Sequence, residues 1–228
     1  MLNNNSLNRV KNWLLNCHAS HTAPCNTRES SNRHIPTRLI EVTTNQGLIV
    51  IRLFETQQHL STELRWIALS YCWGGAQPLV TSKKNYISHL TGIPLDHLPS
   101  TLRDAVTVTS LFGIRFIWID VLCIVQDDPT DVAWEISFMP DVFQCAWLTI
   151  SASSAESARE GFLKDRDFDS HVLSTHEYRP DDGSSGSVML VRRDTKWRSS
   201  QEDDPMKSRA WTLQEHLLPP RLLEFSTG

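Results

Sequence analysis

Two carboxylates and a thiol lie close in sequence to the apolar run Ile114–Ile119. Asp120 and Cys123 directly follow this run, and Glu135 lies in a helix-forming segment a little further on. A short run rich in β-branched and aromatic residues is typical of a strand buried on both faces. The carboxyl ends of such strands form the edge where open α/β sheets bind ligands. The spacing therefore predicts a ligand site that includes Asp120 and Cys123.

Glu135 lies on the shoulder of a predicted buried helix stripe. Val132, Ile136 and Met139 recur at helical spacing, and Glu135 is next to Met139 on the helical wheel. A solvated glutamate is more comfortable on the opposite face. A partly buried carboxylate is suited to stabilising a cation that develops during a reaction.

A second polar segment, Cys72-Trp73-Gly74-Gly75, follows the predicted strand Arg65–Tyr71. The paired glycines permit a tight turn and a close approach of the backbone to another group. Neither a GxGxxG nor a Walker pattern is present, so the segment is a weak candidate for phosphate binding.

A strand–helix–strand unit over 113–150 positions these residues. Asp128 suits the N-cap of the helix and Pro129 its first position, whereas Pro140 falls inside it and predicts a kink. We predict an α/β fold with a mainly parallel sheet and flanking helices. Its central strand is expected at Ile114–Asp120, between Arg65–Tyr71 and Trp147–Ser151.

Weaker patterns predict the remaining elements, which include a β-hairpin and a polar insertion. They are a hairpin of Arg38–Val42 and Leu48–Leu53, a helix Ser100–Phe112 capped by Ser100 and ended by Gly113, a polar segment 155–187, a short strand Val188–Val191, a helix Arg209–Leu218 capped by Ser208, and a strand Leu222–Phe225.

Three metal-capable side chains, Cys17, His21 and Cys25, recur every four residues near the N-terminus. Structural zinc sites need four closed ligands, and the segment has neither a CxxC pair nor a clear fourth ligand. The preferred interpretation is therefore no metal, and an N-terminal helix packed on the domain through Trp13 and Leu14.

Composition limits the classes of function. The 228 residues suggest a polar N-terminal arm, 1–35, and one domain, 36–228, which ends without a closing element and so favours a trimmed or truncated form. A net charge of −4 gives no support for nucleic-acid or anionic-membrane binding. Five irregularly spaced cysteines and the lack of a signal-peptide core favour a reducing, cytoplasmic location.

Four blocks in order resemble the heterokaryon incompatibility (HET) domain of filamentous fungi, over roughly 65–225. The blocks are Ala68-Leu69-Ser70-Tyr71-Cys72-Trp73-Gly74, then Leu98-Pro99-Ser100-Thr101-Leu102-Arg103-Asp104-Ala105, then Ile117-Trp118-Ile119-Asp120 with Leu122-Cys123-Ile124 and Gln126-Asp127-Asp128, and finally Arg209-Ala210-Trp211-Thr212-Leu213-Gln214-Glu215. Each block alone is weak, but four in this order and spacing are highly specific.

The resemblance implies a role in fungal nonself recognition, in which activation leads to growth arrest or programmed cell death. It also implies a remote similarity to TIR domains, and hence a TIR-like or flavodoxin-like sheet. TIR domains assemble and in some members cleave NAD. Self-association or contact with other incompatibility proteins is the partnership that it suggests.

If NAD is a substrate, the resemblance suggests catalytic roles for Glu135 and Asp120. Glu135 would stabilise an oxocarbenium-like transition state. Asp120 would bind ribose hydroxyls, Trp73 would stack on a base, and Gly74, Gly75 and Cys123 would line the ligand site.

A structural interpretation of the same residues stays open. Glu135 then pairs with Arg115 or Arg103, Asp120 caps the following turn, and Cys123 is a small buried residue. The matching functional alternative is a non-catalytic adaptor that self-associates through its helix faces.

Overall fold

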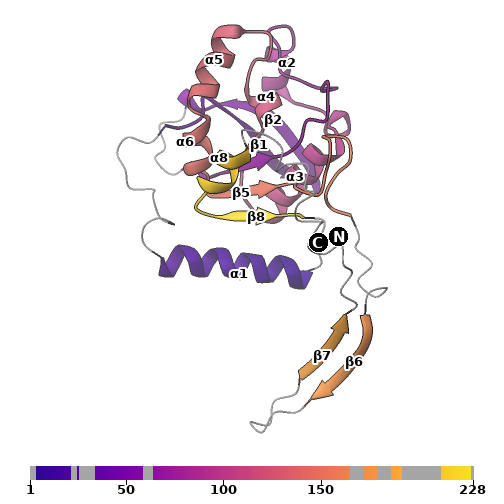
Figure 1. Ribbon diagram of the computed structural model, residues 1–228. Coiled ribbons are helices and arrows are strands. Elements are labelled where there is room, and N and C mark those ends of the chain that lie inside the picture. Colours follow the sequence, from indigo (N-terminus) through magenta and orange to yellow (C-terminus); the bar gives the residue numbers. More distant parts are fainter. Residues whose placement is uncertain are drawn as a thin grey trace.

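A six-stranded sheet forms the centre of the protein, in the order β2-β1-β4-β3-β5-β8 (Figure 1). The computed structural model describes residues 4–21, 25, 34–58, 64–164, 172–178, 186–191 and 212–226. The strands of the sheet are β1 (Arg38–Asn45), β2 (Leu48–Glu55), β3 (Trp66–Ser70), β4 (Phe116–Trp118), β5 (Leu148–Ser151) and β8 (Leu222–Glu224).

Helices and 3-10 turns connect and cover these strands. They are α1 (Asn4–Ser20), η2 (Thr56–Gln58), α2 (Tyr86–Thr91), η3 (Leu95–His97), α3 (Ser100–Leu111), α4 (Asp120–Cys123), α5 (Pro129–Ser137), α6 (Met139–Gln144) and α8 (Thr212–Leu217). α3 packs on β1 and β4, α2 contacts β2, and α6 contacts α8.

The parallel part of the sheet has a flavodoxin-type order. β4, β3, β5 and β8 run parallel, while β1 is antiparallel to both β2 and β4. In chain order the four parallel strands lie as second, first, third and fourth, so the strand order reverses between β3 and β5. The predicted α/β class with a mainly parallel sheet is therefore confirmed.

The predicted neighbours of the central strand were partly wrong. β4 pairs with β3 as expected, but its other neighbour is β1, through Ile40 opposite Ile117. β5 pairs with β3, so β3 and not β4 is the middle of the parallel set. Every residue of β3 is buried, and a strand covered on both faces and both edges is suited to this position.

The predicted β-hairpin is confirmed as β1 and β2. Gln46 and Gly47 connect the strands, and both have positive φ values, 49° and 81°. Two positive φ angles characterise the type I′ turn, whose twist matches the twist of paired strands. A second hairpin, β6 (Val172–Tyr178) with β7 (Gly186–Val191), forms a separate sheet within the region predicted as a polar insertion and the short strand after it.

The helix boundaries test the capping predictions. The Asp128 side chain accepts a hydrogen bond from the Thr130 amide at the start of α5, as predicted. The chain then breaks at Phe138, and Pro140 lies in the first turn of α6, so the predicted kink is a complete break. Proline is tolerated there because the amides of a first turn need no helical partner.

Ser100 does not cap α3. The residue before the helix is Pro99, and no side chain caps this end; instead the Thr101 amide bonds to the carbonyl of Ala158. A neighbouring loop thus satisfies the helix end that we expected Ser100 to satisfy. Gly113, with φ of 70°, ends the helix as predicted.

The N-terminal and C-terminal elements meet at one edge of the sheet. α1 runs alongside β8 in Figure 1, and Leu14 of α1 is fully buried in the main core, whereas Trp13 is largely exposed. The predicted strand Leu222–Phe225 is confirmed as β8 and the predicted last helix, in its described part, as α8. Ser208 and the residues up to Trp211 lie outside the described residues.

Candidate functional site

Asp120 and Trp73 meet at the carboxyl edge of the parallel strands. Asp120 follows β4 and begins α4, and its Oδ1 accepts a hydrogen bond from the Val121 amide at 2.6 Å. Its Oδ2 accepts a hydrogen bond from the Trp73 indole at 2.7 Å. Both side chains are half-buried. The carboxylate therefore fixes the turn after β4 and also orients the indole that follows β3.

Glu135 is buried against a cation that the sequence did not suggest. Its side chain is only 1% exposed, and Oε1 lies 3.3 Å from Nη2 of the buried Arg38. The same Nη2 lies closer to the Asp131 carboxylate, at 2.7 Å from Oδ1 and 2.5 Å from Oδ2. Arg38 comes from β1, so this ion cluster joins the hairpin to α5.

The two arginines expected to pair with Glu135, Arg115 and Arg103, bind other groups. Arg115 and Arg52 both bind the carboxylate of Glu41, across the first three strands of the sheet. Arg103 donates to the carbonyl of Leu98. Pairing of Glu135 with Arg115 or Arg103 is thus wrong, because Arg38 reaches it from a strand that is distant in sequence.

Burial controls the protonation of Glu135. Loss of solvent raises the pKa of its carboxyl above the ordinary value, and the nearby charge of Asp131 adds to the rise. A hydrogen bond from Thr37 and the charge of Arg38 act in the opposite direction. The raised pKa shows that the cation only partly offsets the loss of water.

Cys123 binds Arg38 through its backbone carbonyl and has a buried thiol. Its carbonyl accepts a hydrogen bond from Nε of Arg38 at 2.6 Å, and its thiol accepts one from the Ile119 amide at 3.4 Å. Burial raises the pKa of this thiol to about 12, so it is protonated at neutral pH. The charges of Glu135 and Asp120 also raise the pKa of this thiol, whereas the charge of Arg38 lowers it.

The two glycines after Trp73 have different surroundings. Gly74 has φ of 67°, and a Cβ there would lie 2.2 Å from the Cβ of Ser157. The close approach that we predicted is therefore to the protein's own chain. Gly75, with φ of 122°, has open space where a side chain would lie.

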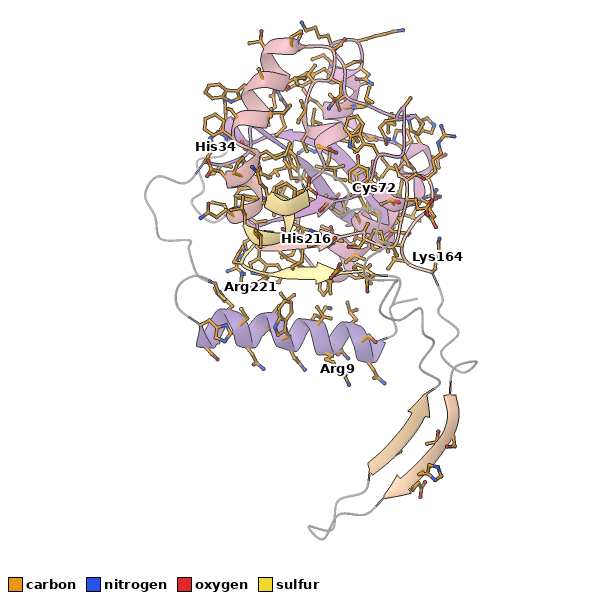
Figure 2. All side chains as sticks on the ribbon, in the orientation of Figure 1. Arg9, His34, Cys72, Lys164, His216 and Arg221 are labelled. Carbon is orange, nitrogen blue, oxygen red and sulfur yellow. The ribbon has the colours of Figure 1, made fainter. Side chains whose placement is uncertain are left out.

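A polar cluster that the sequence reading missed lies at the reversal point between β3 and β5. The hydroxyl of Ser70, the last residue of β3, donates to Oε2 of the buried Glu215 at 2.5 Å. Ser151, the last residue of β5, bonds to Ser153 at 2.8 Å, and Ser153 donates to Glu224 at 2.9 Å. Figure 2 shows His216 in this region; its Nε2 lies 3.4 Å from the Ser151 hydroxyl.

Two residues of this cluster belong to the sequence blocks that resemble the family, but nothing in the sequence indicated that they meet. Ser70 is in the first block and Glu215 ends the last one, so their hydrogen bond joins blocks 145 residues apart. Nothing in local spacing predicts such a contact. Open α/β sheets bind ligands at this reversal point, and here the chain's own α8 lies over it.

The second block contacts the loop after β5. Asp104 of the second block accepts hydrogen bonds from the amides of Phe162 and Leu163, at 2.8 and 3.0 Å. Thr101 donates to the carbonyl of Ser157 and accepts from the Gly161 amide. These residues fix the loop after β5 against the start of α3.

The fold defines an α/β domain with a flavodoxin-type parallel sheet. One carboxylate cluster, Asp131 and Glu135, surrounds Arg38, and a second, Glu215 and Glu224, binds the serines that follow the strands β3 and β5 or end them. The model of the family "Heterokaryon incompatibility protein (HET)" matches residues 66–215, well over half of the 228 residues. The chain therefore belongs to the heterokaryon incompatibility family. Neither a search of curated proteins nor one of solved structures found a match.

Membership links the chain with heterokaryon incompatibility in fungi. Among the described residues, no helix has both the length and the apolar character that a membrane crossing requires.

Proposed function

We propose that this chain is an effector of fungal nonself recognition, which causes growth arrest or cell death after fusion of incompatible cells. The family match over 66–215 carries this proposal. Two hydrogen bonds between distant blocks, Ser70 to Glu215 and Trp73 to Asp120, support it, because they indicate that the blocks form one intact domain.

In the first version of this function, the effector cleaves NAD at the carboxyl edge of β3 and β4. The bond between ribose C1′ and the nicotinamide nitrogen breaks, and nicotinamide leaves with the bonding electrons. Water adds to C1′ and loses a proton. A carboxylate beside C1′ lowers the barrier, since positive charge develops there.

The geometry around Trp73 supports a ligand role for this edge. Asp120 holds the indole by a direct hydrogen bond, so Trp73 is oriented for stacking on a base. Gly75 leaves open space beside it. Cys123 contributes through its carbonyl, which fixes Arg38, while its enclosed thiol stays protonated.

Glu135 acts on a substrate only after a rearrangement, because it is 1% exposed. The guanidinium lies 3.3 Å from Glu135 but 2.5 Å from Asp131. Release of Glu135 therefore leaves Arg38 with its closer partner. We infer that assembly of several copies opens this pair and presents Glu135 to the ribose.

The second version is a non-catalytic adaptor that acts by self-association. An exposed apolar face of α5 supports this version: Trp134 is 55% exposed and Ile136 is also exposed. In that case Arg38 and Glu135 are a structural pair, and the domain works through contacts alone.

An NAD assay on the purified chain, with and without a crowding agent that forces assembly, separates the two versions. The enzyme version requires nicotinamide release that falls by orders of magnitude in Glu135→Gln, whereas the exposed Glu160→Gln serves as a matched control. Expression in a fungal cell, with NAD content and growth followed at matched levels, tests the effector role itself. Toxicity that persists in Glu135→Gln at constant NAD supports the adaptor, and absence of toxicity in the wild type contradicts both versions.

A further inference from the structure

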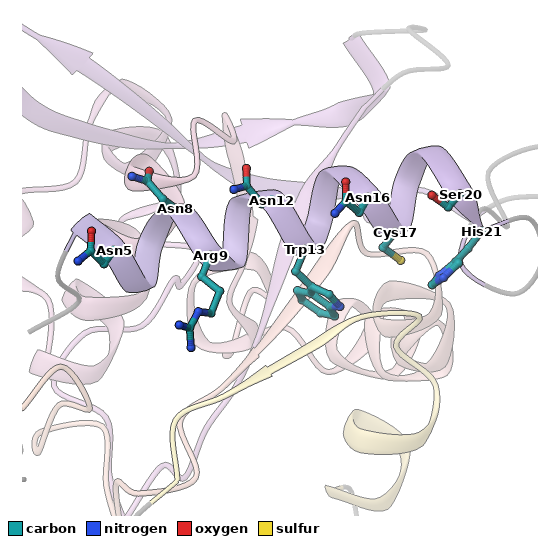
Figure 3. A pocket seen from close by; sticks show the side chains of 9 residues that line it. All are labelled: Asn5, Asn8, Arg9, Asn12, Trp13, Asn16, Cys17, Ser20 and His21. Carbon is teal, nitrogen blue, oxygen red and sulfur yellow. The ribbon is translucent and has the colours of Figure 1, made fainter. Parts of the chain in front are cut away.

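The side chains of Cys17, His21 and Cys25 converge at the C-terminal end of α1. Their ligand atoms, two sulfurs and one imidazole nitrogen, all lie within 4.8 Å of one another. Figure 3 shows Cys17 in the last turn of the helix and His21 just beyond its end, with their side chains on the same side. These are the nitrogen and sulfur ligands that zinc prefers.

The convergence is not a by-product of helical spacing. In a continuous helix, Cys17 and Cys25 would be about 12 Å apart along the axis, at about 1.5 Å per residue. α1 ends at Ser20 instead, and the Cys25 sulfur returns to within 4.8 Å of the Cys17 sulfur. The sequence pattern assumed one helix face and therefore underestimated how closely these groups meet.

Arg221 makes the surroundings of the sulfurs polar. It is a buried residue just before β8, and Figure 2 shows it beside the C-terminal end of α1. Its Nε donates to the sulfur of Cys17 at 3.2 Å, and Nη2 donates to the carbonyl of Cys25 at 2.9 Å. Nη1 donates to the carbonyl of Trp147, which fixes the guanidinium on the sheet.

A guanidinium that donates to a cysteine sulfur fits a metal-bound thiolate. Outer hydrogen bonds of this kind orient metal ligands, and the positive charge offsets part of the charge of two thiolates. The hydrogen bond to the Cys25 carbonyl holds the backbone that presents the second sulfur. A cysteine pair that only filled space in a core would not need such a donor.

We propose that Cys17, His21 and Cys25 bind a zinc ion, which fastens α1 to the edge of the sheet through Arg221. Tetrahedral zinc with bonds of about 2.0–2.3 Å places its ligand atoms about 3.5–4 Å apart, so the three groups need to close by only about 1 Å. His21 is exposed and a surface groove passes Cys17 and His21, which gives the ion an entry path. Three protein ligands leave the fourth position open, so a water molecule from the groove would complete the tetrahedron and the site would not be a closed four-ligand site.

Cobalt titration of the full chain, purified with a reducing agent and without chelator, tests the site. Tetrahedral Co²⁺ bound by thiolates gives visible bands and a sulfur-to-metal charge-transfer band. We expect one Co²⁺ per chain, displaced by Zn²⁺. Cys25 is half-buried, so Cys25→Ser should leave the fold intact. Loss of this ligand should abolish the charge-transfer band or lower the affinity for Co²⁺ at least about tenfold.

Cys145→Ser is the matched control, because Cys145 is also a half-buried cysteine outside any disulfide and lies at the end of α6. It should bind Co²⁺ as the wild type does. His21→Ala, at an exposed position, should weaken binding without loss of fold.

Amide exchange of α1 provides a readout that does not depend on colour. Zinc should slow exchange over Asn4–Ser20 in the wild type and leave it unchanged in Cys25→Ser. Two results would overturn the proposal: Cys25→Ser that binds Co²⁺ with the affinity and charge-transfer band of the wild type, or a reduced wild type that binds no Co²⁺. A Cys17–Cys25 disulfide in mass spectra, with no metal uptake after reduction, would identify the pair as a redox bridge and also contradict it.

Discussion

At the scale of single residues, Arg38 is the cation that pairs with the carboxylates of Asp131 and Glu135. It binds Asp131, Glu135 and the carbonyl of Cys123 with one buried guanidinium. Buried ions are costly to leave unpaired, so each member of this cluster depends on the others.

Replacement of Arg38 tests this dependence. Arg38→Met should lower the free energy of unfolding by about 3–5 kcal/mol, because Glu135 would be left buried without a cation. The double variant Arg38→Met with Glu135→Gln should recover part of that loss. Denaturant unfolding of the four proteins in this cycle measures the coupling.

The pair of Arg52 with Glu41 provides the control, since Arg52 is partly exposed and Arg115 also binds this glutamate. Arg52→Met should change stability by no more than about 1 kcal/mol. Equal losses for the two arginines would contradict the special role of Arg38.

The pKa of Glu135 predicts a pH dependence with a definite sign. The folded-state pKa is raised, so the folded protein favours the protonated carboxyl. The stability from this group is fully present below the unfolded pKa and is lost as pH rises through the folded value. Unfolding measured across this range should therefore show that the wild type loses stability relative to Glu135→Gln as pH rises. A gap that widens in favour of the wild type would show that the pKa is lowered instead.

At the scale of elements, the loop after β3 is defined by its packing against the loop after β5. Gly74 combines a positive φ with a contact to Ser157 that leaves no room for a Cβ. A change there should disturb both loops at the carboxyl edge.

Gly74→Ala should cost about 2–4 kcal/mol, the sum of backbone strain and a steric clash. Gly47→Ala isolates the first contribution, because Gly47 also has a positive φ but has open space around it. It should cost only about 1–2 kcal/mol. Thermal unfolding of both variants makes the comparison, and equal losses would rule out the clash.

Local patterns predicted the elements, whereas the contacts between them were beyond the reach of the sequence. The cap at Asp128, the disturbance of the helix at Pro140 and the turn at Gln46-Gly47 depend on neighbouring residues, so the sequence predicted them, although it predicted a kink where the helix breaks. The central place of β3 depends on which strands cover it. The pairing of Glu135 with Arg38 depends on the position of β1 beside β4, across 97 residues of chain.

At the scale of the whole molecule, the last sequence block contacts the first one at the edge of the sheet. Glu215 of α8 accepts the hydroxyl of Ser70, and β8 adds to β5 directly afterwards. The carboxylate thus joins the middle strand of the parallel set to the edge element.

Glu215→Ala should loosen α8 and β8, because Ser70 would lose its acceptor inside the protein. We expect faster amide exchange over 212–224 and a loss of about 1–3 kcal/mol. Glu215→Gln keeps an acceptor oxygen and should be affected much less. Similar exchange in both variants would mean that the contact does not hold this edge.

The contact of α1 with Arg221 also bears on how the protein folds during its synthesis. Cys17 and Arg221 are 204 residues apart in the chain. Ribosomes release the N-terminal part first, at about 5–20 residues per second, so α1 waits on the order of ten seconds or more for its partner. Contacts between distant residues also form slowly, because a long loop must close first. The domain therefore becomes complete only after β8 has emerged, and the nascent chain is delayed in reaching its folded form.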